Sequence, residues 1–338
     1  MGNHATPSRS FNTVKHSNRD KRVKRQRQQR MILNAIFAVV AVILLCLLIF
    51  VIGMIVDTVG SGKENPDNAL NPSGSQQGTQ DVTYISVTQM KNAVHTGELL
   101  VVNSQNQYHF PSVTTGLKTI ADNRVKYEGV SNTYMVKTDE VWKLHTVALN
   151  ALNDMMYKYY EIFQDGSVMV TSAYRSYEYQ DRPSFSTPAG YSDHHTGLCV
   201  ALNQGSTGKE LLEDDHWIYQ NCHKYGFVVR YPAEKSAITG VSGYEYCFRY
   251  VGVAHATYMY NNGLCLEEYV ELIKNTYTTN NHLKITGADG KNYEVYYVPA
   301  ADTELTTLQV PKNYQYTVSG DNIGGFIVTV CLDTPANA

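Results

Sequence analysis

The most informative stretch of the chain is residues 191–201, which read YSDHHTGLCVA. A polar turn with two adjacent histidines stands directly before an apolar segment. If residues 198–202 are extended, Cys199 and Ala201 share one face, because side chains alternate along a strand. His194 and His195 are neighbours in sequence, so we expect their side chains to point to different places.

Two further segments accompany this stretch, residues 172–180 (SAYRSYEYQ) and residues 244–252 (YEYCFRYVG). In this order, the three segments resemble the motifs S-G-Y-R-S-x-x-x-Q, S-x-H-x-x-G-x-A-x-D and E-x-W-H-[FY]-R-Y-V-G of VanY-type D-alanyl-D-alanine carboxypeptidases. Residues 225–232 and 263–269 are also similar to family segments. The resemblance covers residues 83–276 and implies an α+β fold, an antiparallel sheet with helices.

The resemblance implies a zinc enzyme that trims peptidoglycan stem peptides, with three metal ligands and a glutamate base. The ligand positions fall on His194, Ala201 and Cys247, and the base position falls on Tyr244. Alanine cannot bind a metal, and a neutral tyrosine is a poor base. Glu245 is adjacent, but a shift of one residue along a strand turns a side chain to the opposite face. We therefore predict a vestigial His194, no metal cofactor and no hydrolysis by the family mechanism.

Cys247 leaves alternatives open, because thiolate is a good zinc ligand. A rebuilt zinc site can combine His194 and Cys247 with a third group such as His195 or Asp193. Alternatively, a disulfide between Cys199 and Cys247 replaces zinc as the cross-link, or both remain free buried thiols.

The resemblance also implies a recognition site for the terminal D-alanine and its carboxylate, which carries over to Arg175, Gln180 and Ser192. A guanidinium group suits a free carboxylate, because two parallel charge-assisted hydrogen bonds fix its position and angle. An internal ion pair of Arg175 is the structural alternative.

The N-terminal part of the chain has the pattern of a membrane anchor. Residues 1–30 hold nine Lys or Arg residues and one acid, whereas residues 31–56 contain no charge. A helix over residues 35–56 is about 33 Å long, enough to cross a bilayer core. The positive flank predicts a cytoplasmic N-terminus and an extracytoplasmic C-terminal part of a bacterial single-pass membrane protein. Residues 57–82 are rich in Gly, Ser, Asn, Gln and Pro and predict a flexible linker.

The remaining pattern predicts three helices, two strands and a β-rich extension. The helices are expected at 140–164, 209–225 and 266–274, and the strands at 167–171 and 227–231. Residues 277–338 predict a small all-β extension with strands at 283–286, 292–298, 306–310, 315–318 and 326–331. Asp289-Gly290 is a strong hairpin signal between the first two.

These features favour a membrane-anchored pseudopeptidase that binds stem peptides or a cell-wall protein without cutting them. The alternatives are an active zinc carboxypeptidase with an unusual ligand set, and an extracytoplasmic scaffold that binds no peptide. Residues 31–338 carry a net charge of −11, which argues against a nucleic-acid partner. His216 and His223 fit a solvated helix face better than a metal site, and His255 is expected to be a packed histidine.

Overall fold

The computed structural model of the chain describes residues 82–126, 128–130, 132–204, 216–242, 244 and 246–336. All of them belong to one compact unit, Thr79–Ala338. Among these residues, no helix is both long enough and apolar enough to span a bilayer. The predicted transmembrane helix 31–56, the basic tail 1–30 and residues 57–81 of the linker lie outside the described residues, so they remain predictions.

A five-stranded sheet carries the segments that the sequence singled out, with strand order β3–β5–β6–β8–β7. The strands are β3 Met135–Val136, β5 Val168–Ser172, β6 Cys199–Gln204, β8 Cys247–Tyr250 and β7 Phe227–Val229. Neighbouring strands are antiparallel, except that β3 and β5 are parallel. The sheet and its helices agree with the predicted α+β class.

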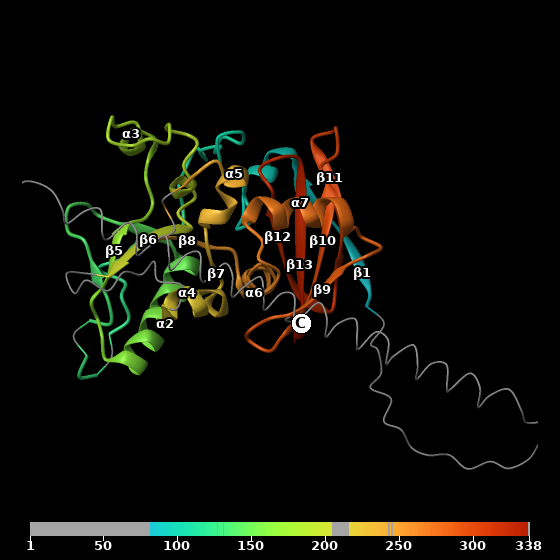
Figure 1. Cartoon of the computed structure of the whole chain (residues 1–338). Coiled ribbons are helices and arrows are strands. Elements are labelled where there is room, and N and C mark those ends of the chain that lie inside the picture. Colours follow the sequence, from blue (N-terminus) through green and yellow to red (C-terminus); the bar gives the residue numbers. More distant parts are fainter. Residues whose placement is uncertain are drawn as a thin grey trace, which may run out of the picture. The chain divides into compact units, whose positions relative to one another are not determined.

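Helix α2, Thr146–Phe163, packs on this sheet (Figure 1). Its buried residues are Ala148, Leu149, Leu152, Asn153, Met155, Met156 and Tyr159. The prediction that this helix begins at residue 140 was wrong, because Lys143–His145 form strand β4 and pair with β2, Leu117–Thr119. Leu144 is fully buried in β4. A single buried leucine fits a strand as well as a helical stripe, which explains the error.

The ends of the predicted α2 stripe are exposed. Val141 precedes the helix and is 62% exposed, and Ile162 in its last turn is 48% exposed. The described part of the predicted helix 209–225 consists of α4, Trp217–Asn221, and the 3₁₀ helix η3, Cys222–Tyr225, while residues 209–215 lie outside the described residues. Gly226 ends η3 with a φ of 81°, a conformation that favours glycine.

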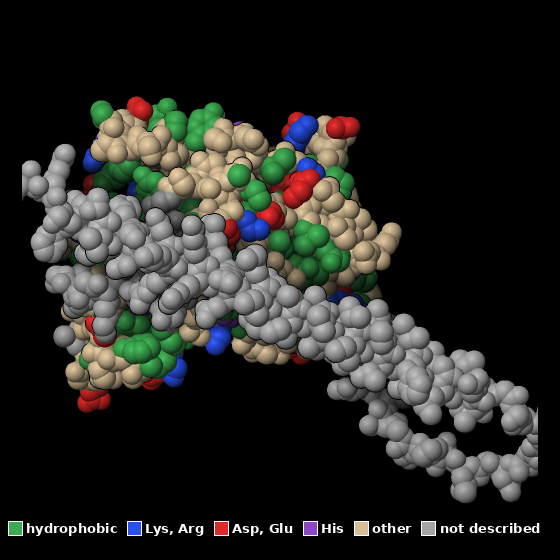
Figure 2. All heavy atoms as spheres, viewed as in Figure 1, with side chains coloured by type: hydrophobic (Ala, Val, Ile, Leu, Met, Phe, Trp, Pro, Cys, Tyr) green, Lys and Arg blue, Asp and Glu red, His purple; other side chains and the backbone are tan. Residues whose placement is uncertain are grey.

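The other short helices lie in the connections. They are η1 Lys91–His95, α3 Tyr177–Gln180, η2 Asp193–Thr196, η4 Ala233–Lys235 and α5 Ser236–Thr239. Longer helices follow β8, namely α6 Val253–Asn262 and α7 Leu266–Thr276. Acidic and basic side chains lie side by side over α7 (Figure 2), where Lys235 and Glu268 form an ion pair at 2.8 Å.

The C-terminal part is all-β, and all five of its predicted strands are present. The strands are β9 Leu283–Thr286, β10 Asn292–Pro299, β11 Leu305–Pro311, β12 Tyr314–Gly320 and β13 Gly325–Pro335. Four of them form an antiparallel sheet of order β12–β13–β10–β9. Thr286 pairs with Asn292 on either side of the predicted Asp289-Gly290 turn, so the hairpin is confirmed.

The extension does not pack alone. Tyr269, Val270 and Ile273 of α7 share one hydrophobic cluster with Val295 of β10 and Ile327 of β13. The fifth strand, β11, pairs in antiparallel register with β1, Tyr84–Met90, which is the first described strand of the chain. The two parts on either side of residue 276 are therefore joined by a common core and by strand pairing.

Candidate functional site

The η2 turn, Asp193–Thr196, positions the residues on which the site is built. All four of its residues are buried. Gly197 ends the turn with a φ of 68°, and a Cβ atom at this position would lie 2.6 Å from Leu117 Cδ2. Only glycine fits this conformation and this space without strain. The turn therefore leads directly into β6 with each of its side chains in a defined direction.

His194 is held in one orientation by the backbone. Its Nδ1 donates a hydrogen bond to the carbonyl oxygen of Ala173 at 2.7 Å, so Nε2 keeps a free lone pair. Nε2 lies 3.9 Å from the Sγ atom of Cys247. Burial, and secondarily the charge of Arg175, hold the pKa of His194 well below its ordinary value. His194 is thus a neutral imidazole aimed at sulfur.

Two cysteine side chains complete a cluster with His194, which we call the sulfur cluster. Ala201 of β6 pairs with Cys247 of β8, and Cys199 lies two residues before Ala201 on the same strand. Both cysteines are buried free thiols. One ligand atom from each of His194, Cys199 and Cys247 lies within 4.8 Å of the other two. Burial and the neighbouring Cys247 raise the pKa of Cys199.

The sulfur cluster fits a zinc ion in its donor atoms and its spacing. Zinc takes tetrahedral N and S ligands at about 2.0–2.3 Å, which places ligand atoms about 3.5–3.8 Å apart. Small side-chain movements reach this spacing from the observed arrangement. The Nδ1–H bond to a backbone carbonyl is the usual second contact of a metal-binding histidine. His194, Cys199 and Cys247 would hold the ion, and Ala201 contributes no donor.

The other candidate ligands in the turn point away from the cluster, each to its own partners. His195 Nδ1 donates to the carbonyl oxygen of Arg175 at 2.7 Å, and its Nε2 accepts from the Gly190 amide at 2.9 Å. Asp193 is fully buried between Arg249 and Arg230. The hypothesis of a rebuilt site with His195 or Asp193 as the third ligand therefore finds no support in their geometry.

The Asp193 side chain belongs to a charged network that the sequence reasoning missed. Arg249 Nη1 bonds to Asp193 Oδ1, and Arg230 Nε lies 3.2 Å from Asp193 Oδ2. Arg230 also binds Glu267 of α7, with a distance of 2.8 Å from Nη2 to Oε1. Arg249 Nη2 donates to the carbonyl oxygen of Glu98 at 3.0 Å. Charged residues are rarely this deeply buried, so residue type did not predict the network. The only available signal was that both arginines stand in segments similar to those of the family.

Arg175 and Gln180 form a second group, and the charge of Arg175 interacts with the two cysteines of the sulfur cluster. Arg175 Nη1 donates to Gln180 Oε1 at 3.0 Å, and Nε donates to Ser172 Oγ at 2.9 Å. The guanidinium carbon lies 4.4 Å from the centre of the Phe185 ring. Gln180 Nε2 in turn donates to the carbonyl oxygen of Thr187 at 2.7 Å. Within the described residues, Arg175 belongs to no ion pair, so the structural alternative of an internal partner is not realised there.

Burial lowers the pKa of Arg175, and the cysteines of the sulfur cluster partly offset this effect. The guanidinium group therefore carries a partly desolvated positive charge beside neutral partners. Ser192, the third predicted recognition residue, is buried directly before η2, and its carbonyl oxygen accepts from the His195 amide at 3.1 Å. The structure thus brings Arg175 and Gln180 into direct contact and places Ser192 at the start of the same turn as His194.

The position of the family base is occupied by an exposed tyrosine. Tyr244 is 37% exposed, and its hydroxyl lies 3.5 Å from Ser186 Oγ. Glu245 lies outside the described residues. No acidic side chain has therefore been located at this position among the residues that the structure describes.

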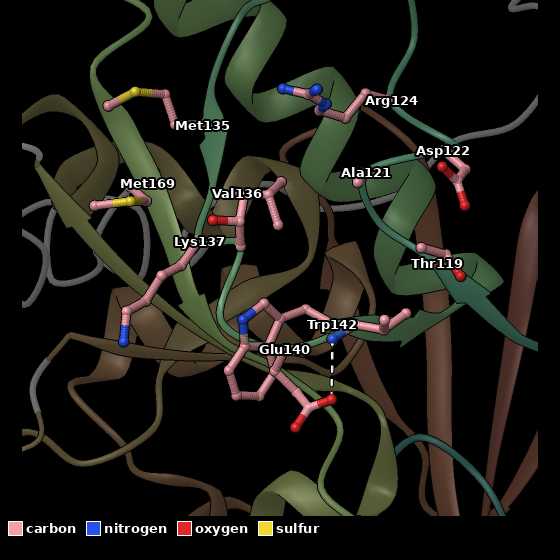
Figure 3. A pocket seen from close by; sticks show the side chains of 12 residues that line it. Thr119, Ala121, Asp122, Arg124, Met135, Val136, Lys137, Glu140, Trp142 and Met169 are labelled. Atoms are coloured by element: carbon pink, nitrogen blue, oxygen red, sulfur yellow. Dashed lines mark hydrogen bonds between the residues drawn. The ribbon is translucent and has the colours of Figure 1, made fainter.

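Three other histidines that the sequence analysis considered have structural contacts. His216 accepts from the Ile218 amide at the start of α4, and His255 packs as predicted between Tyr269 and Thr329. The expected solvated face was wrong for His223, which is buried and stacks on Tyr260. A surface pocket of about 580 Å³ lies elsewhere, between β3, β5 and the segment before β4 (Figure 3). Trp142, Arg124 and Met135 are among its lining residues, and none of the candidate site residues described in this section lines it.

Known proteins share this arrangement of segments. A family model described as VanY, D-alanyl-D-alanine carboxypeptidase, matches residues 142–253. A D-alanyl-D-alanine carboxypeptidase of Enterococcus faecium is 31% identical over 279 residues, which cover 79% of this chain and 84% of that protein. A D-alanyl-D-alanine carboxypeptidase of Enterococcus faecalis is 44% identical over 88 residues, covering 25% and 32%.

A solved structure is similar over most of the described unit. The vancomycin resistance D,D-dipeptidase VanXYg, in complex with a D-Ala-D-Ala phosphinate analog, aligns with a TM-score of 0.61 and 27% sequence identity. The alignment covers 74% of this chain and 99% of that chain.

Proposed function

This chain belongs to the VanY family of D-alanyl-D-alanine carboxypeptidases, and we propose that it binds the carboxyl end of peptidoglycan stem peptides without hydrolysing them. The observation that carries this proposal is the state of Arg175. Its guanidinium group is half-buried, bonds to the neutral Ser172 and Gln180, and belongs to no ion pair of the described residues. A free carboxylate is the partner that such a group lacks.

The absence of hydrolysis is proposed from the residues that replace the family set. Ala201 offers no ligand atom, and Tyr244 stands at the base position with its hydroxyl 3.5 Å from Ser186. A tyrosine hydroxyl is a poor general base for activating water. Binding through Arg175, Gln180 and Ser192 requires neither residue.

The proposal is tested with the full chain purified in detergent micelles. We expect a peptide ending in D-alanyl-D-alanine to bind, and the same peptide with an amidated carboxyl end to bind far more weakly. Arg175→Ala should reduce the affinity about 10–100-fold, since a hydrogen bond to a charged group contributes about 1.5–3 kcal/mol. Arg182→Ala is the matched control, because Arg182 is an exposed arginine that follows α3 and lies over Tyr179.

Chromatographic detection of free D-alanine completes the test, and we expect none above a protein-free control. Equal affinity for the free and amidated peptides would refute carboxylate recognition and favour the scaffold. Zinc-dependent release of D-alanine would replace the proposal by the second candidate, an active zinc carboxypeptidase with a non-standard ligand set. That candidate is supported by one observation, the close approach of His194, Cys199 and Cys247.

We also propose that residues 31–56 anchor the protein in the cell membrane, with the domain that follows residue 82 outside the cytoplasm. The uncharged run and the basic residues before it support this placement. Protease added to intact spheroplasts should release the C-terminal domain by cleavage within residues 57–82. Cleavage only after lysis would place the domain in the cytoplasm and contradict the proposal.

A further inference from the structure

The geometry of β6 gives the sulfur cluster a donor atom two residues before the position of the family's ligand. The ligand position is therefore displaced along the strand and not lost. Cys199 and Ala201 point to the same face of β6, because they are two residues apart. Ala201 pairs directly with Cys247 across the β6–β8 ladder, and Cys199 lies one diagonal step away. A donor atom lost at position 201 is therefore available again at position 199, on the same side of the sheet.

The third donor is already oriented. The bond from His194 Nδ1 to the carbonyl oxygen of Ala173 fixes the ring, and Nε2 lies 3.9 Å from Cys247 Sγ. The charge of Arg175 acts on both sulfur atoms, while Ala201 and Tyr231 pack around them in the same buried cluster. Such surroundings exclude water, which strengthens the attraction between a cation and thiolate ligands.

We propose that His194, Cys199 and Cys247 bind one thiophilic divalent metal ion, with zinc as the chemically expected occupant. Both cysteines release their protons to solvent and bind as thiolates. Two thiolates and a neutral imidazole bring the charge of the site to zero, whereas one carboxylate and two imidazoles leave one positive charge. A neutral centre polarises its surroundings less, and its three ligands would join η2 to β6 and β8.

The proposal does not depend on peptide binding, and its test uses metal readouts alone. The full chain is reduced, stripped with a chelator and titrated with Co²⁺ and then Zn²⁺. We expect one equivalent of Co²⁺ to bind with tetrahedral visible bands and a near-ultraviolet sulfur-to-cobalt charge-transfer band. One equivalent of Zn²⁺ should then bleach both.

Variants identify the ligands. Cys199→Ser and Cys247→Ser should each remove about half of the charge-transfer intensity and weaken Zn²⁺ binding at least about 100-fold, since even outer contacts of ligands contribute 10–100-fold. Cys222→Ser is the matched control, because Cys222 is a buried free thiol outside the cluster. The double variant Cys199→Ala with Ala201→Asp should retain Co²⁺ with half of the charge-transfer band. Circular dichroism identifies any variant that fails to fold. If Cys199→Ser does not fold, the charge-transfer band of the double variant shows whether Cys199 is a ligand.

Three results would overturn the proposal. The first is wild-type protein that binds less than one equivalent of either metal under reducing conditions. The second is a Cys199→Ser or double-variant spectrum equal to that of wild type. The third is a Cys199–Cys247 disulfide, found by mass spectrometry of alkylated peptides, in protein isolated from its own cells without reductant.

Discussion

The two consecutive residues Asp193 and His194 lie in one turn and enter two different interiors. Asp193 enters a charged network in which its carboxylate faces Arg249 and Arg230, and Arg230 faces Glu267. His194 enters the sulfur cluster, where one ring nitrogen is bonded to the backbone and the other faces thiols. Each charged group of this network faces an opposite charge within the protein. The sulfur cluster, in contrast, has donor atoms that can bind a further atom.

The charged network positions the turn, whereas the sulfur cluster supplies its reactive groups. The charged network involves β8, α7 and the segment before the central sheet, so it fixes the place of η2 in the unit. The sulfur cluster contributes only three donor atoms at one face of β6 and β8. Its chemistry can therefore change through substitutions at positions 199, 201 and 247 while the turn stays in place.

The strongest test of this contrast removes the charge of Asp193. Asp193→Asn removes the buried carboxylate that faces both Arg249 and Arg230, and breaking a buried ion pair in this way costs about 3–5 kcal/mol. We expect the free energy of unfolding, measured by urea denaturation, to fall by this amount. Glu161→Gln breaks the exposed pair with Lys158 and should cost less than about 1 kcal/mol. Similar losses for both variants would contradict the structural role of the network.

A buried histidine with neutral partners offers a second test, in acid. His255 bonds to the Tyr269 hydroxyl and to Thr329 Oγ1, and burial lowers its pKa to about 4. Between pH 6.5 and 4 the unfolded chain binds a proton at His255 that the folded chain does not, so this residue lowers the stability by about 3 kcal/mol as the pH falls. His255→Gln should flatten this part of the stability profile. An unchanged slope would show that His255 does not cause it.

The smallest effect concerns the recognition group. Phe185 lies under the Arg175 guanidinium, and a cation–π contact contributes about 0.5–1 kcal/mol at a partly exposed site. Phe185→Leu should therefore weaken binding of a D-alanyl-D-alanine peptide about two- to fivefold by calorimetric titration. Phe163→Leu, at the end of α2, provides the control. A loss as large as that of Arg175→Ala would mean that Phe185 contacts the peptide itself.

The sequence predicted those parts of the molecule that depend on local pattern. The C-terminal strands and the Asp289-Gly290 hairpin follow from alternation and turn residues, and α7 follows from spacing and begins at the predicted Leu266. The start of α2 was not predictable, because β4 forms only by pairing with the distant β2. The alternation along β6 placed Cys199 on the correct face. Its approach to His194 required the course of the η2 turn, which no periodicity encodes.

The charged network escaped prediction for a related reason. The hydropathy of arginine predicts an exposed side chain, whereas Arg230 and Arg249 are fully buried. Their partners come from elements distant in sequence, namely η2, α7 and the segment around Glu98. Only the assembled fold brings these groups together.

The pairing of β1 with β11 has a consequence for how the protein is made. The bond between the Ser86 and Gln309 side chains joins residues 223 positions apart. β1 is synthesised long before β11 and stays an unpaired edge until residues 305–311 are available to pair with it. Contacts this distant form late and slowly, and an unpaired strand edge is prone to aggregation. The exposed Ile85 and Met90 add apolar surface to this edge, so a chaperone that covers β1 would protect the chain until β11 pairs with it.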